Sequence, residues 1–128
     1  LQSYLHRTLA DAQELVKLPA RIRICKGAYF EPPEVAYSDK KDVDANYVKV
    51  MKVLLSSGIY HGIATHDPKM IEATIDFASR EGVGKEKYEF QMSADPQFES
   101  IVIGEGRPIR YLVPEGVKTY IDKAGLYR

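Results

Sequence analysis

Two hydrophobic periodicities alternate along this 128-residue chain, and this alternation restricts the fold more than any other feature of the sequence. Short segments with apolar residues at every second position indicate strands, and longer segments with a period of three to four indicate helices. Strands that alternate with helices form parallel sheets with right-handed crossovers. We therefore expect an α/β fold of about five strand–helix units.

The boundaries of these units follow from local signals. The expected strands lie at 1–5, 21–28, 61–66, 88–92 and 108–113. The expected helices lie at 8–17, between Asp42 and Gly58, between Asp67 and Gly82, at 95–103 and at 117–124. Aspartates are good N-caps, Pro68 suits a first helical position, and glycines often follow helix ends. A long loop at 29–41 precedes the second helix.

Two architectures contain such units, an open doubly wound sheet and an eight-stranded barrel. No Gly-x-Gly-x-x-Gly element follows any expected strand, so a Rossmann site has no support. A complete barrel takes about 250 residues. The chain alone is therefore too short to close such a barrel, and both architectures stay open at this point. Because the chain opens on an apolar segment without Met, we also expect it to be a piece of a longer protein.

Composition excludes several classes of function. The 18 basic residues equal the 18 acidic ones, so no nucleic-acid partner is expected. Cys25 is the one cysteine, which rules out an intramolecular disulfide, and no metal site is expected. The apolar runs are too short for a membrane span. We expect a cytoplasmic protein, and peripheral contact with the inner face of the membrane is compatible with these features.

Polar residues collect at the carboxyl ends of the expected strands, where active sites lie in parallel α/β folds. These residues are Arg23, Lys26, Gly27, Tyr29, Thr65, His66, Asp67 and Gln91. Cations and small residues together suit an anionic cofactor, because backbone amides at Gly27 and Ala28 can approach it closely. Arg23 can stabilise negative charge on a reduced flavin ring.

Each of these residues also has a structural interpretation. Arg23 can be an ion-paired strand residue, Lys26 can simply face solvent, and His66 can belong to a helix cap. Gly27 can serve only to allow tight packing between strand and loop. We interpret Cys25 as a small buried residue rather than a reactive thiol.

Four sequence blocks, in order and at matching spacing, resemble the proline dehydrogenase family over residues 1–92. Residues 1–8 are similar to the opening of its fourth barrel strand, and residues 23–29 (RICKGAY) resemble its R-L-x-K-G-A-Y motif. Residues 64–67 (ATHD) and 90–92 (FQM) match A-T-H-[DN] and F-Q-M. The resemblance implies a distorted (β/α)8 barrel that binds FAD, oxidises L-proline to 1-pyrroline-5-carboxylate and passes electrons to a membrane quinone. Residues 1–128 would then form one partial (β/α)8 TIM-like barrel domain.

The resemblance also implies roles for single residues. Gln2 would contact the flavin ring, and Arg23 would lie near its N5–O4 edge, where hydride arrives. Tyr29 would lie near the substrate proline. The remaining FAD-binding positions would be Lys26, Gly27, Ala28, Thr65 and His66.

Beyond Met92 the resemblance weakens. Residues 93–95 (SAD) replace the family's L-[YH]-G, and in residues 110–116 a leucine, Leu112, stands where the family has Tyr. The terminal R-R-L-x-E-N segment, whose arginines hold the proline carboxylate, has no counterpart in this sequence, and neither do the first three strands. We therefore expect the FAD-binding part of the site without the complete proline-binding part.

Two other functions remain open. Lys26 at a strand end is the kind of group that forms a Schiff base, as in aldolase-like barrels. Alternatively, the chain is a non-catalytic remnant that associates with partner chains, or with copies of itself, through the unpaired edges of its sheet.

Overall fold

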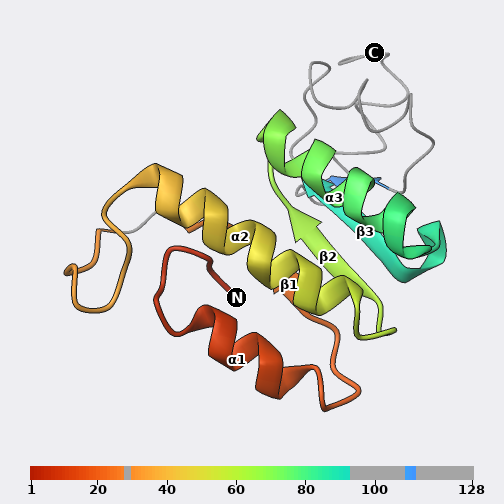
Figure 1. Ribbon diagram of the computed structural model, residues 1–128, viewed down its shortest axis with the longest axis horizontal. Helices are drawn as coiled ribbons and strands as arrows, with labels where there is room; N and C mark the ends of the chain where they lie inside the picture. Colours follow the sequence, from red (N-terminus) through yellow and green to blue (C-terminus); the bar gives the residue numbers. More distant parts are fainter. Residues whose placement is uncertain (28–29, 93–108, 112–128) are drawn as a thin grey trace.

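The computed structural model describes residues 1–27, 30–92 and 109–111, and its strands form one parallel sheet. The strands are β1 (Arg23–Ile24), β2 (His61–Ala64), β3 (Tyr88–Met92) and β4 (Ile109–Tyr111), hydrogen-bonded in that order (Figure 1). Because sequence order equals spatial order, each crossover adds the next strand at the same edge, as in a barrel. The predicted α/β class is confirmed. The predicted helices at 95–103 and 117–124 lie outside the described residues.

In the part of the chain that the structure describes, the helices lie along one face of this sheet (Figure 1). They are α1 (Thr8–Leu15), α2 (Lys40–Leu55) and α3 (Pro68–Glu81), and a short 3₁₀ turn, η1 (Lys85–Lys87), precedes β3. Helix α2 lies between α1 and α3 and contacts both. No helix in the described ranges is long and apolar enough to cross a membrane.

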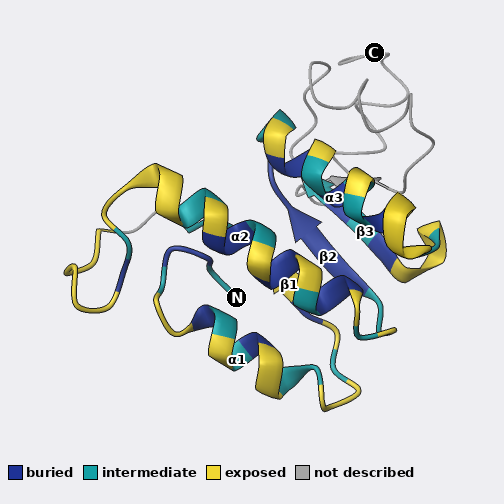
Figure 2. Cartoon of the chain, viewed as in Figure 1, coloured by how far each residue is buried: buried dark blue, intermediate teal, exposed yellow. Residues whose placement is uncertain are grey.

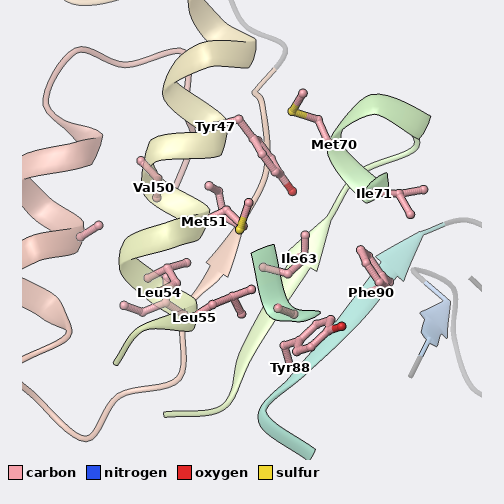
Figure 3. Packing of buried hydrophobic residues seen from close by; sticks show 14 residues of the cluster. Tyr47, Val50, Met51, Leu54, Leu55, Ile63, Met70, Ile71, Tyr88 and Phe90 are labelled. Atoms are coloured by element: carbon pink, nitrogen blue, oxygen red, sulfur yellow. The ribbon is translucent and has the colours of Figure 1, made fainter. Parts of the chain in front are cut away.

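The hydrophobic core lies between the helices and this face of the sheet (Figures 2 and 3). Ile24, Ile63 and Phe90 point from the strands toward the helices and are fully buried. They meet an apolar stripe of α2 formed by Tyr47, Val50, Met51 and Leu54. Strand residues alternate between faces, so the neighbours of these core residues in sequence lie on the other side of the sheet.

The predicted boundaries of α3 are confirmed. The Asp67 carboxylate accepts a hydrogen bond of 2.9 Å from the backbone N–H of Lys69, and Pro68 occupies the first helical position. The helix ends at Gly82, whose φ of 68° is left-handed. All three signals act within one turn of the residue that carries them, which is why the sequence alone located them.

The predicted boundaries of α2 are wrong. Its N-cap is Asp39, whose carboxylate accepts from Lys41 N–H at 3.0 Å, and Asp42 lies in the first turn instead. An acidic residue is favourable there because it faces the positive end of the helix dipole. At the other end the C-cap is Ser56, and Gly58 lies beyond it.

The predicted strand at 1–5 is present only as isolated bridges, from Gln2 to Cys25 and from Leu5 to Ala36. Gln2 forms one parallel bridge with Cys25, and the chain then turns, because Leu5 N–H bonds back to the Gln2 carbonyl at 3.3 Å. The predicted strand at 21–28 is shortened to β1, although its alternation of exposed and buried residues is present. Strands β2 and β3 match their predicted ranges closely, and β4 lies within its own.

His61 at the start of β2 makes folding stability dependent on pH. Its Nδ1 accepts the Ile22 N–H at 3.0 Å and its Nε2 lies 2.9 Å from Ser57 Oγ, so the buried ring fits here as a neutral imidazole. Burial lowers the pKa of His61 from 6.5. The unfolded chain therefore binds the proton more readily, and stability falls as pH drops below about 6.5. Urea denaturation at pH 7.5 and pH 5 measures this loss.

A His61→Asn variant should lose stability at neutral pH and lose most of this pH dependence between 7.5 and 5. His66→Gln, a change at an exposed histidine, should leave the pH dependence in place. An unchanged pH dependence in His61→Asn would mean that other groups cause it.

Candidate functional site

A cavity lies at the carboxyl ends of β1 and β2. Its volume is about 400 Å³, within the range of small-molecule sites. Its walls are formed by Arg23, Cys25, Lys26, Lys40, Ala64, Thr65, His66 and Asp67. The structure therefore brings together four residues predicted to bind the cofactor, Arg23, Lys26, Thr65 and His66, at the carboxyl ends of the strands, where they were expected.

Arg23 lies on the face of the sheet that points away from the helices, because its neighbour Ile24 points into the core. Its Nε donates a hydrogen bond of 2.9 Å to Oε1 of Gln91 on β3. This partner is a neutral amide, so the bond fixes the guanidinium without neutralising it. The structure thus gives Arg23 a different partner from the ion pair considered above.

Lys26 is tied to two acidic side chains. Its ammonium lies 2.7 Å from Asp44 Oδ1 on α2 and 2.6 Å from Asp67 Oδ2 at the start of α3. Burial favours the neutral amine, but the two carboxylates outweigh it and raise the pKa of Lys26. The interpretation of Lys26 as solvent-facing is therefore wrong. Because its charge is already matched, Lys40 and Arg23 are better placed to meet an anion in this cavity.

Gly27 lies where β1 passes into the loop, and it lines a neighbouring cavity of about 410 Å³ that also includes Lys26 and Lys40. A β-carbon at Gly27 would lie 2.3 Å from Cδ1 of Tyr4, and the φ of this glycine is 92°. Both facts require glycine, which supports the packing interpretation whatever else the backbone does. The predicted site residues Ala28 and Tyr29 lie outside the described residues.

Thr65, His66 and Asp67 form the turn from β2 into α3. The Thr65 hydroxyl accepts a 3.0 Å bond from the Asp67 N–H, and Asp67 itself caps the helix. His66 is therefore not the capping residue, and its exposed side chain lines the first cavity. Hydrogen bonds from Lys26 and the Lys69 N–H outweigh the effect of burial and lower the pKa of Asp67.

Gln2 and Cys25 face the same side of the sheet, because they form a parallel bridge. Gln2 does not contribute to the wall of the first cavity, whereas Cys25 does. Cys25 is half-buried, so its interpretation as a buried residue holds only in part.

Sequence reasoning missed Lys40 because it placed the start of α2 three residues too late. It also missed Asp44, whose role as a partner of Lys26 depends on contact between distant segments. Asp39, an aspartate that can cap a helix, is the signal that would have placed Lys40 at the start of α2.

The residues of the two cavities fit an elongated anionic cofactor. Lys26 and Lys40 line both cavities, which places the two spaces next to each other. Two small residues, Ala64 and Cys25, are among those that line the first cavity, and small side chains leave room there for a flat ring. Cationic side chains and small residues side by side are what a flavin dinucleotide requires from its site.

The proline dehydrogenase family model matches residues 1–117. This chain belongs to the proline dehydrogenase family. It is 41% identical over 122 residues to proline dehydrogenase 2 of Bacillus subtilis and, at the same identity, to a proline dehydrogenase of Deinococcus radiodurans. These matches cover 94% of the chain but only 40% and 39% of the two relatives. The chain thus spans about two fifths of their length.

A solved structure agrees with this assignment. The crystal structure of proline utilization A from Bdellovibrio bacteriovorus, inactivated by N-propargylglycine, superposes with a TM-score of 0.80 at 27% identity. The match covers 89% of this chain and 14% of that protein. The arrangement of parallel strands and helices in proline utilization A is therefore shared by this chain of the proline dehydrogenase family.

Proposed function

We propose that this chain supplies the FAD-binding part of an enzyme that oxidises L-proline to 1-pyrroline-5-carboxylate and passes the electrons to a quinone. The observation that carries this proposal is the cation-lined cavity at the carboxyl ends of β1 and β2, in a chain of the proline dehydrogenase family. Parallel α/β proteins bind their ligands at this edge of the sheet.

The position of each residue in the cavity indicates its role in binding FAD. When bound, FAD supplies the acceptor for a hydride from the carbon next to the amine nitrogen. Arg23, on the face of the sheet that points away from the helices, offers a positive charge to the electron-rich edge of the ring. Lys40, which lines both cavities, offers its ammonium to a phosphate. His66 lies at the rim, and Thr65 shapes the turn beneath it.

The Schiff-base alternative requires an amine that loses its proton readily. Lys26 has the opposite environment, because Asp44 and Asp67 hold its ammonium and raise its pKa. Trapping of a carbonyl substrate on Lys26 by borohydride is therefore not expected.

Removal of the Lys40 cation should weaken FAD binding about tenfold, the effect of losing one charge-assisted contact. Titration of the protein with FAD, followed by flavin fluorescence, compares Lys40→Ala with Lys41→Ala. Lys41 is the adjacent helical lysine and lines neither cavity, so its replacement should leave the affinity within about twofold. Equal effects of the two variants would contradict the assignment of Lys40.

The proposal that this chain binds FAD is tested with the unmodified protein. After incubation with FAD and desalting, a retained flavin absorption band would support it, and bleaching of that band by L-proline would show that this chain also oxidises the substrate. A colourless protein would overturn it, and an assembly of several chains by gel filtration would then favour the alternative of a non-catalytic, partner-binding remnant.

A further inference from the structure

A hydrogen bond joins side chains of two strands that are not neighbours. Arg23 is in register with Gly62 and Gln91 with Ala64, and β2 lies between β1 and β3. Neighbouring strands are about 4.8 Å apart, so side chains from β1 and β3 must cross about 10 Å to meet. The 2.9 Å bond from Arg23 Nε to Gln91 Oε1 therefore runs across the middle strand.

Gly62 leaves the space through which this contact passes. A β-carbon at Gly62 would lie 2.5 Å from Nε2 and 2.8 Å from Cδ of Gln91. Gly62 is not one of the positive-φ glycines in the described ranges, so its backbone does not require glycine. A β-carbon at this position would therefore have to displace the Gln91 amide.

Glu89 determines which way the Gln91 amide points. The two residues are two positions apart on β3, so they share a face, and Gln91 Nε2 donates to Glu89 Oε1 at 3.3 Å. An ionised carboxylate only accepts hydrogen bonds. The amide nitrogen therefore turns to Glu89, and the amide oxygen turns to Arg23.

The bond uses only one of the five N–H groups of Arg23. Holding Nε fixes the plane of the guanidinium and restricts a side chain that otherwise has many rotamers. The four N–H groups at its outer end are not needed for this contact and can meet a ligand in the cavity that Arg23 lines.

We propose that Gln91 is a positioning residue for Arg23. Glu89 orients the Gln91 amide, and Gly62, which has no side chain, leaves the space that the amide occupies. The effect on a flavin rests on the proposed function, whereas the orientation of Arg23 does not. Gln91 itself holds the guanidinium in place ahead of ligand binding, which avoids the entropy loss of ordering it later.

The test without cofactor follows the Arg23 Nε–H group by NMR. Gln91→Met keeps the length of the side chain and removes the acceptor, so exchange of this proton with water should become about tenfold faster. Gly62→Ala should have the same effect by displacing the amide. Because both act on one contact, the double variant should exchange no faster than either single one. Gln91→Glu retains an acceptor and should retain the protection.

The test with cofactor measures the two-electron midpoint potential of bound FAD. With Arg23 no longer held, reduced flavin should be disfavoured about tenfold in Gln91→Met, a shift of about 30 mV to more negative potential. Gln13→Leu, a change at an exposed glutamine of α1, should leave the potential unchanged. A potential shift that persists in Gln91→Glu would contradict a positioning role.

The two proposals fail in different ways. A wild-type protein that retains no FAD overturns the proposed function, while the exchange measurements still decide the role of Gln91. Unchanged Arg23 exchange in Gln91→Met, or a further effect of Gly62→Ala in that variant, overturns the positioning role even if FAD binds. Circular dichroism of each variant confirms that the fold is intact, and Gln91→Glu still tests the contact if Gln91→Met does not fold.

Discussion

Replacement of Lys26 by Met should destabilise the protein by about 2–3 kcal/mol at neutral pH. The Lys26 ammonium joins the end of β1 to α2 through Asp44 and to the start of α3 through Asp67, and all three side chains are about four-fifths buried. Met fills the space but leaves two carboxylates facing each other without a cation. Removing one partner of a buried ion pair costs more than forming the pair gains, because the remaining charges stay desolvated. Denaturation in urea measures the loss.

The pH dependence of this loss has a defined sign. In the native protein, stability from Asp67 is present above its ordinary pKa of 3.8 and is lost as pH falls through the lowered value. In Lys26→Met, the Asp67 carboxylate has lost the cation that lowers its pKa, and with it the stability that this shift contributes above pH 3.8. The variant therefore recovers relative to the native protein as pH falls, and the difference should shrink below about 1 kcal/mol near pH 4.

Lys17 provides the matched control. It forms an ion pair of 2.9 Å with Glu14, and both side chains are about two-thirds exposed or more. Lys17→Met should change the free energy of unfolding by less than about 0.5 kcal/mol. If Lys26→Met costs as little as Lys17→Met, the ion pairs of Lys26 do not hold the helices to the sheet.

Replacement of Gly27 by Ala should destabilise the protein by about 3 kcal/mol. Two costs combine here. A φ of 92° is strained for any residue with a β-carbon, at about 1–2 kcal/mol. The new methyl group would also lie 2.3 Å from the ring of Tyr4, which is 7% exposed, and its displacement adds about 1–3 kcal/mol. Chemical denaturation measures the sum.

Gly58 separates the two costs. Its φ is 76°, but nothing lies within 4 Å of a β-carbon built there. Gly58→Ala should therefore cost only the conformational part, about 1–2 kcal/mol. In a Tyr4→Ala background, Gly27→Ala should likewise lose the packing part of its effect. If Gly27→Ala and Gly58→Ala lower the free energy of unfolding equally in the native background, the Tyr4 ring moves aside without a measurable loss of stability.

Features that depend on neighbours in sequence were predictable. Asp67, Pro68 and Gly82 delimit α3 through hydrogen bonds and φ values within one helical turn, and the sequence located all three. The prediction of Asp42 as the cap of α2 was wrong, because Asp39 is an equally good cap and the polar residues between the two carry no hydrophobic period.

The hydrophobic periodicity of the sequence showed the alternation of strands and helices and thereby determined the parallel α/β class. It also determined that Arg23, Lys26, Thr65 and His66 gather at the carboxyl ends of the strands. Only the tertiary structure decided what these side chains do there. Lys26 meets Asp44 and Asp67 from two helices, and Arg23 meets Gln91 across Gly62. Hydrophobic periodicity indicates which face of an element a side chain lies on. The hydrogen-bond partner of that side chain can lie up to 68 residues away in the sequence, and only folding brings the two within hydrogen-bond distance.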